Sequence, residues 1–155
     1  MQEQTVNAMR NRLIAYRRLN EEIDYQLERL DRLQTRASSI GGNHLSGMPK
    51  APSGPYDKIA DSVARIVDLE NEIKDLVRKR DEERRAIEML ALTLKNPSER
   101  AVIRSRYLDL EEWDDVQFVL FGSNEDYDSN FDDYKQKMYR WHRTAIRNMS
   151  QSNAP

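Results

Sequence analysis

"MRNRLIAYRRLNEEIDYQLERL", residues 9–30, decides how this chain begins to fold. Its apolar side chains recur in steps of four and three, and Asn20 takes one position of the series. The series is Met9, Leu13, Tyr16, Asn20, Ile23, Leu27 and Leu30. This heptad spacing puts all of them on one stripe of a helix, while Arg and Glu fill the other faces. It predicts a helix over residues 7–35 that pairs with another helix along this seam.

A second stretch with a similar repeat covers residues 57–94. Its apolar residues are Ile59, Val63, Ile66, Leu69, Ile73, Leu76, Ile87 and Leu90, with Arg80 and Glu83 as interruptions. Residues 37–56 hold four of the five glycines and three of the five prolines, which predicts a flexible linker. We therefore expect residues 1–94 to form a long antiparallel helical hairpin or coiled coil. Asn20 either fixes the register of the seam or lies at its edge.

Residues 95–150 predict a second domain of three short helices, so the fold class is all-α. Asn96, Pro97 and Glu99 are typical of a helix start with a capping box. Gly122 is expected as the C-terminal cap of the next helix, and Ser129 as the start of the last one. The residues expected to face inward are Val102, Ile103, Tyr107, Trp113, Val116, Val119, Leu120, Phe131, Tyr134, Met138, Trp141, Ala145 and Met149.

Composition narrows the classes of function. The chain has 155 residues, of which 38% are hydrophobic and 34% charged, with a net charge of -2 and no cysteine. Disulfides and thiolate metal sites are therefore excluded. No apolar run approaches the roughly 20 residues of a membrane span. We expect a cytoplasmic protein, and any affinity for nucleic acid must come from a local patch.

"KQKMYRWHRTAIRNM", residues 135–149, supplies such a patch, because it holds five cations and no acid. At helical spacing its apolar residues fall on one side and its arginines on the other. The candidate DNA-binding residues are Lys135, Gln136, Tyr139, Arg140, Arg143 and Arg147. Such donors suit phosphates and guanine edges. The alternative is a solvated basic face that complements the helix dipole.

The stretch from Glu111 to Asp133 has the opposite character, with nine acids and no Lys or Arg. It would repel phosphate if it faced DNA, or it could bind a basic protein surface. Its alternating acids resemble a calcium loop, but Phe131 occupies the required glycine position and Lys137 the position of the bidentate Glu. We expect no metal and no cofactor. His44 and His142 have no nucleophile or ligand partner nearby in sequence, so we expect no enzyme.

Four passages together resemble small phage-encoded transcription regulators of the ArpU/RinA-like group, which are similar to region 4 of sigma factors at their C-terminal end. They are "YRRLNEEIDYQLERLDRL", "LSGMP", "IVDLENEI" and "ERAVIRSRYLDLEEWDDVQFVLFG" with "YRWHRTAI". The resemblance implies a sigma-like helix-turn-helix domain, with "YKQKMYRWHRTAI" as the recognition helix and Tyr139, Arg140 and Arg143 facing DNA. The long acidic turn before this helix departs from the compact turn of that pattern.

The resemblance implies a phage or prophage transcription regulator that binds duplex DNA through its last helix in the cytoplasm of a bacterial host. RNA polymerase or another phage or host protein is a further expected partner, and a homodimer is expected from the seam and from operator symmetry. The alternative is an interaction protein that binds a repressor, a polymerase subunit or a CRISPR effector without contacting DNA.

Overall fold

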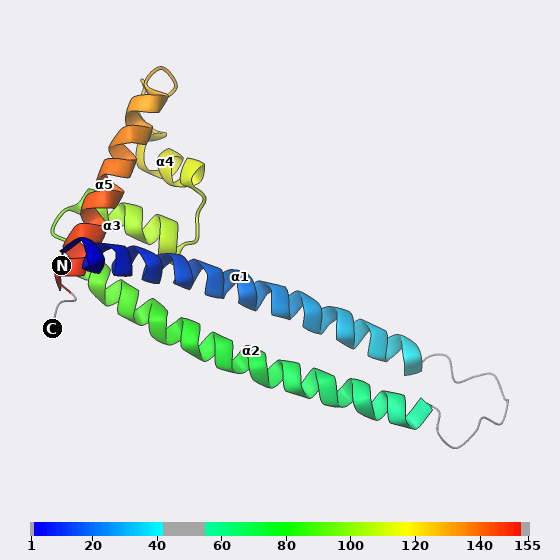
Figure 1. The fold of residues 1–155 in the computed structure, drawn as a ribbon. Coiled ribbons are helices and arrows are strands. Elements are labelled where there is room, and N and C mark those ends of the chain that lie inside the picture. Colours follow the sequence, from blue (N-terminus) through cyan, green and yellow to red (C-terminus); the bar gives the residue numbers. More distant parts are fainter. Residues whose placement is uncertain (1, 42–54, 153–155) are drawn as a thin grey trace. The chain divides into compact units, whose positions relative to one another are not determined.

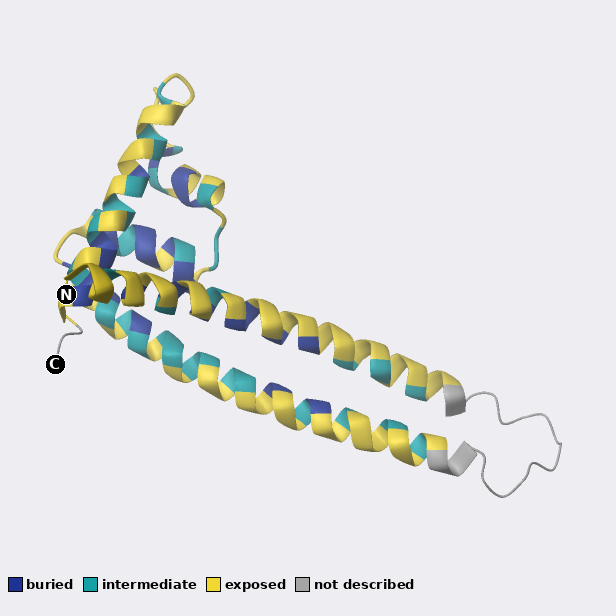
Figure 2. Ribbon diagram, in the orientation of Figure 1, coloured by how far each residue is buried: buried dark blue, intermediate teal, exposed yellow. Residues whose placement is uncertain are grey.

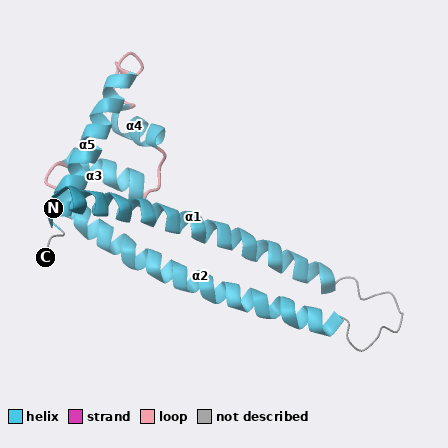
Figure 3. Ribbon diagram, in the orientation of Figure 1, coloured by secondary structure: helices cyan, strands magenta, loops and turns pink. Residues whose placement is uncertain are grey.

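The computed structural model describes residues 2–41 and 55–152, which form helices and contain no strand (Figures 1 and 3). The elements are α1 (Gln2–Gly41), α2 (Pro55–Leu92), α3 (Pro97–Ile103), the π-helical turn η1 (Arg104–Leu108), α4 (Trp113–Phe121) and α5 (Phe131–Ser152). The all-α class is confirmed. Both long helices extend into the predicted linker 37–56. The rest of that linker, with His44 and the "LSGMP" passage, lies outside the described residues.

The chain divides into two compact units. Unit 1 comprises Met1–Arg18 and Asp81–Pro155, and unit 2 comprises Leu19–Arg80. The predicted boundary between residues 94 and 95 does not coincide with this division. The first turns of α1 and the last turns of α2 belong with the short helices, because their apolar residues share a core with them.

Unit 2 pairs the distal parts of α1 and α2, and its seam differs in detail from the predicted one. Ile23, Leu69 and Ile73 are buried as expected. The predicted seam residue Leu27 is 46% exposed, whereas its neighbour Gln26 is buried, and Val63 is 51% exposed. A straight helix drifts against a strict heptad, so the buried stripe moves by one residue along α1. The seam is buried within one chain, so the expected homodimer stays a prediction.

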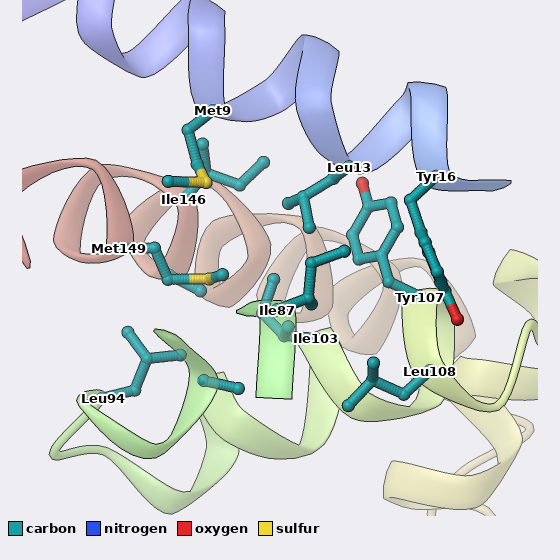
Figure 4. Packing of buried hydrophobic residues seen from close by; sticks show 12 residues of the cluster. Met9, Leu13, Tyr16, Ile87, Leu94, Ile103, Tyr107, Leu108, Ile146 and Met149 are labelled. Carbon is teal, nitrogen blue, oxygen red and sulfur yellow. The ribbon is translucent and has the colours of Figure 1, made fainter. Parts of the chain in front are cut away.

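The core of unit 1 joins three stretches that are far apart in sequence: the start of α1, the region from the end of α2 to η1, and α5. Figure 4 shows Met9 and Leu13 of α1 directed toward Ile146 and Met149 of α5. The buried cluster is Met9, Leu13, Tyr16, Ile87, Ala91, Leu94, Ile103, Tyr107, Leu108, Ala145, Ile146 and Met149. Burying side chains of this size contributes roughly 1.5–3 kcal/mol each. The cluster therefore fixes α3 and the C-terminal half of α5 against the ends of the long helices within this unit.

Helix α3 begins as the sequence predicts, with one difference. The Asn96 side chain accepts a hydrogen bond from the Ser98 N–H at 2.9 Å, and Pro97 takes the first helical position. Glu99 does not close a capping box. It is buried, and its Oε2 accepts from Asn148 Nδ2 of α5 at 2.9 Å. The carboxylate that could have served its own helix end therefore connects α3 to α5 instead.

A second cluster fixes α4 against α5 and α3. Val102, Val116, Phe121 and Met138 are its buried members, and Figure 2 shows α4 with both buried and exposed residues. The prediction that Val119 faces inward is wrong, because its side chain is 63% exposed. The apolar residues of α4 itself are distributed around its whole circumference, so their pattern alone does not show which side of the helix is buried.

The joint between η1 and α4 is held by arginine side chains. Leu110 has a φ of 61°, in the left-handed region that costs a residue with a Cβ about 1–2 kcal/mol. Arg17 Nη1 donates to the carbonyls of Arg106 and Glu111 at 2.7 and 3.1 Å, and its Nη2 donates to Glu112 Oε1 at 2.7 Å. Arg106 Nη1 also donates to the Glu111 carbonyl, at 2.8 Å. These donors satisfy the carbonyl of Arg106 in the π-helical turn and that of Glu111 in the segment between η1 and α4.

Replacing Arg17 with Met should lower the free energy of unfolding by about 2–3 kcal/mol, because partly buried acceptors would lose a charged donor. Arg17→Lys should recover only part of this loss, since one ammonium cannot reach all three acceptors in the same geometry. Urea unfolding followed by circular dichroism measures both. Arg18→Met is the matched control, because Arg18 is exposed. A loss no larger for Arg17→Met than for Arg18→Met would contradict the role of the joint.

Candidate nucleic-acid interface

Helix α5 separates apolar and basic residues as its sequence predicts. Met138, Ala145, Ile146 and Met149 are fully buried. Gln136, Arg140, Arg143 and Arg147 lie within 60° of one another around the helix at 100° per residue, and all four are exposed. We call these four residues the arginine face. The buried residues fix the rotation of α5, and this rotation leaves the arginine face open to solvent.

The other two predicted DNA-binding residues are less accessible. Lys135 and Tyr139 are half-buried. The Tyr139 ring packs edge-on against Trp113 of α4, with the centroids 5.2 Å apart. Tyr139 therefore serves packing between α4 and α5, and only part of its surface is available to a ligand.

No acid of the described residues pairs with the arginine face. Among the described residues, Arg140, Arg143 and Arg147 form no ion pair. Asp132 and Asp133 are exposed in the first turn of the same helix, where they complement its dipole. Three cations are thus free for an external anion, with two acids at the N-terminal end of the helix.

The acidic turn before α5 is ordered by its own hydrogen bonds. Asp126 accepts from the Tyr134 hydroxyl at 2.7 Å and from Asn130 Nδ2 at 2.8 Å. These bonds, the one from Tyr134 first, lower the pKa of the Asp126 carboxyl. Ser129 does not cap α5 as predicted, because its hydroxyl donates backward to the Asp126 carbonyl at 3.1 Å. The nine-residue segment 122–130 thus includes a folded turn that leads into α5.

His142 directly precedes Arg143 in sequence, but its side chain packs against other elements of unit 1. Its Nε2 is hydrogen-bonded to the Tyr107 hydroxyl at 2.8 Å, and its ring meets Trp113 edge-on at 4.8 Å. Burial, and after it the positive charges of Arg10, Arg106 and Arg143, together lower the pKa of His142 to about 4. The imidazole is therefore neutral at pH 7 and adds no charge to the interface.

Two features of this region were not identified from the sequence. Lys137 extends over the rings of Phe121 and Trp141, with its Nζ 5.9 and 5.3 Å from their centroids. It therefore makes cation–π contacts instead of joining the arginine face. The second feature is the outward position of Phe118 and Val119. The position of Lys137 could not be predicted, because residues 135–149 are basic throughout. The outward position of Phe118 and Val119 could not be predicted, because α4 has apolar residues on all sides.

Comparisons with known protein families, with characterised proteins and with solved structures find no match to this chain. Within the described ranges, none of the helices is both long enough and apolar enough to cross a membrane.

The buried His142 should make stability depend on pH. The unfolded chain takes up a proton near pH 6.5, whereas the folded chain does so only near pH 4. The contribution of neutral His142 to the free energy of unfolding is therefore fully present above about pH 7 and is lost as the pH is lowered toward 4. The loss at pH 5 is about 2 kcal/mol. His142→Gln does not titrate and should lose this component. Urea unfolding at pH 7 and pH 5 measures it, and an equal loss in both proteins would rule His142 out as the cause.

Proposed function

We propose that this protein binds duplex DNA through α5 and acts as a phage or prophage transcription regulator. The observation that carries the proposal is the arginine face, with three exposed arginines and Gln136 opposite a fully buried apolar side. Guanidinium groups bind phosphate oxygens bidentately and also recognise the O6 and N7 atoms of guanine. Helices α4 and α5 would be the two helices of a helix-turn-helix, with α3 as their support.

The acids at the start of α5 determine which part of the helix would contact DNA. A recognition helix usually presents its N-terminal residues to the bases. Here Asp132 and Asp133 stand at that end, and both would repel phosphate. We therefore expect Arg140, Arg143 and Arg147 to make the main contacts, and Gln136 to mark the N-terminal limit of the interface.

The second candidate is an interaction protein that does not contact DNA. The acidic stretch Glu111–Asp133 favours it, because this stretch contains no cation. RNA polymerase and other phage or host proteins are the expected partners in both proposals. The two differ in what loss of the arginines would do, since only the first requires them.

Arg140→Ala combined with Arg143→Ala should weaken DNA binding at least tenfold at about 50 mM salt, because each removes a phosphate or base contact. The slope of log K against log salt should fall by about 2. Fluorescence anisotropy with a labelled pool of 25-base-pair duplexes of random sequence measures both quantities. Thermal unfolding should be unchanged, since both side chains are exposed.

The matched control for this pair is Arg32→Ala combined with Arg36→Ala, which removes the same charge from exposed positions of α1 in unit 2. It should leave affinity nearly unchanged. Equal losses of DNA affinity in the two double variants would mean that only the net charge of the protein matters, and not the position of the arginines. Absence of binding by the unmodified protein at this salt concentration would contradict the proposal and favour the interaction protein.

Asp132→Asn combined with Asp133→Asn should act in the opposite direction. Removing two negative charges from the N-terminal end of α5 should raise the affinity for the same duplex pool several-fold at low salt. The gain should shrink as salt is added, because screening already weakens the repulsion. The anisotropy assay measures it, and unchanged affinity would mean that this end of α5 points away from DNA.

A further inference from the structure

Helix α4 exposes an apolar pair that residues 2–41 and 55–152 leave uncovered. Phe118 is 62% exposed and Val119 is 63% exposed, although they lie in the middle of the helix. Val116 and Phe121 bury the opposite side of α4. Large apolar side chains that stay exposed together are typical of interaction surfaces.

The Phe118 ring is held in place although it is exposed. A Cβ at Gly122 would lie 2.5 Å from the Phe118 carbonyl oxygen and 2.7 Å from Phe118 Cδ2 and Cε2, so the ring lies against this glycine. Gly122 caps α4 as predicted, in a right-handed conformation with a φ of −60°. Close approach of the Phe118 carbonyl oxygen and ring, not backbone strain, is therefore what requires a glycine. The Tyr127 ring meets Phe118 edge-on, with the ring centroids 6.0 Å apart.

Carboxylates surround this pair. Asp114 and Asp115 lie one turn before it on α4, and Asp128 follows Tyr127 in the turn; all three are exposed. Burial raises the pKa of the Tyr127 phenol, and the charges of Asp114 and Asp128 raise it further. Within the described part of the chain, none of the three forms an ion pair.

These six residues make one surface, which we call the acidic–aromatic face: Asp114, Asp115, Phe118, Val119, Tyr127 and Asp128. We propose that it binds a short cationic amphipathic helix of a partner protein, which places an apolar side chain on Phe118 and Val119 and lysines or arginines beside the carboxylates. Charge complementarity identifies the occupant, because the stretch from Glu111 to Asp133 has no cation of its own. The fixed ring lowers the entropic cost of binding.

This surface is separate from the arginine face and would serve a different partner. DNA would be repelled by its carboxylates, whereas a basic peptide would be repelled by Arg140, Arg143 and Arg147. The proposal does not depend on DNA binding. A regulator that binds DNA through α5 could contact a basic protein segment through α4, and an interaction protein could use α4 alone.

The test uses the full chain and an 18-residue peptide of leucine and lysine arranged as an amphipathic helix. A second peptide has the same composition in an order that gives no apolar face. Isothermal titration calorimetry at about 150 mM salt should show at least tenfold tighter binding of the amphipathic peptide, because only this peptide has an apolar face. The two peptides have equal charge, so charge attraction alone cannot cause the difference. Phe118→Ser combined with Val119→Ser should abolish this preference, and Asp114→Lys combined with Asp115→Lys should weaken binding of both peptides.

The matched control is Met89→Ser combined with Leu92→Ser, since these two residues of α2 are 66% and 59% exposed. This control should bind like the unmodified chain, and so should the Arg140→Ala, Arg143→Ala variant. The Phe118→Ser, Val119→Ser variant should retain its affinity for duplex DNA, so failure of either proposal can be recognised separately.

Three results would overturn the proposal. One is equal binding of the two peptides, which would leave only nonspecific charge attraction. Another is normal peptide preference in the Phe118→Ser, Val119→Ser variant. The third is a fall in molecular mass on making that variant, measured by light scattering without peptide, which would identify the occupant as a second copy of this chain.

Discussion

The joint between η1 and α4 is the constraint on which the arrangement of the C-terminal helices depends. The chain changes direction there through a left-handed Leu110, directly after a π-helical turn. Backbone carbonyls in such a segment need donors, and Arg17 of α1 supplies them from 89 and 94 positions away in sequence. Arg106 adds a cation–π contact over Trp113, 4.6 Å from the ring centroid. The start of α4 is therefore fixed by side chains, and α5 packs on a helix whose direction is already set.

This arrangement separates charges that nearly cancel in the whole chain. Arg17 and Arg106 neutralise Glu112, and Asp126 is hydrogen-bonded within the turn, so these groups serve the fold. The remaining acids around α4 and the remaining arginines of α5 stay exposed on different elements. Although the net charge is only -2, the acidic–aromatic face is negative and the arginine face is positive. Each of the two faces suits a partner that the other would repel.

Sequence periodicity predicted the helices well and their buried faces less well. The residues expected to face inward from α3 are buried, and so are Met138, Ala145 and Met149 of α5, because strongly polar residues fill the opposite sides of these helices. Phe131, which was also expected to face inward, is 37% exposed. The orientation of α4 was missed, since apolar residues surround it and packing against Met138 selects Val116 over Val119. Glu99 was assigned to its own helix end, but the tertiary contact with Asn148 proved the better hydrogen bond for a buried carboxylate.

The sequence alone determined the helical class, the two long helices, the cap at Asn96 and the grouping of arginines on one side of α5. These are local properties, since they follow from spacing within a few turns of one helix. Only the tertiary structure decided that the ends of the long helices complete the core of the short ones, that Tyr139 and Lys137 pack against aromatic rings, and that Phe118 stays exposed. Those outcomes depend on contacts between residues far apart along the chain, and no periodicity within a helix encodes which distant side chain will fill the space beside it.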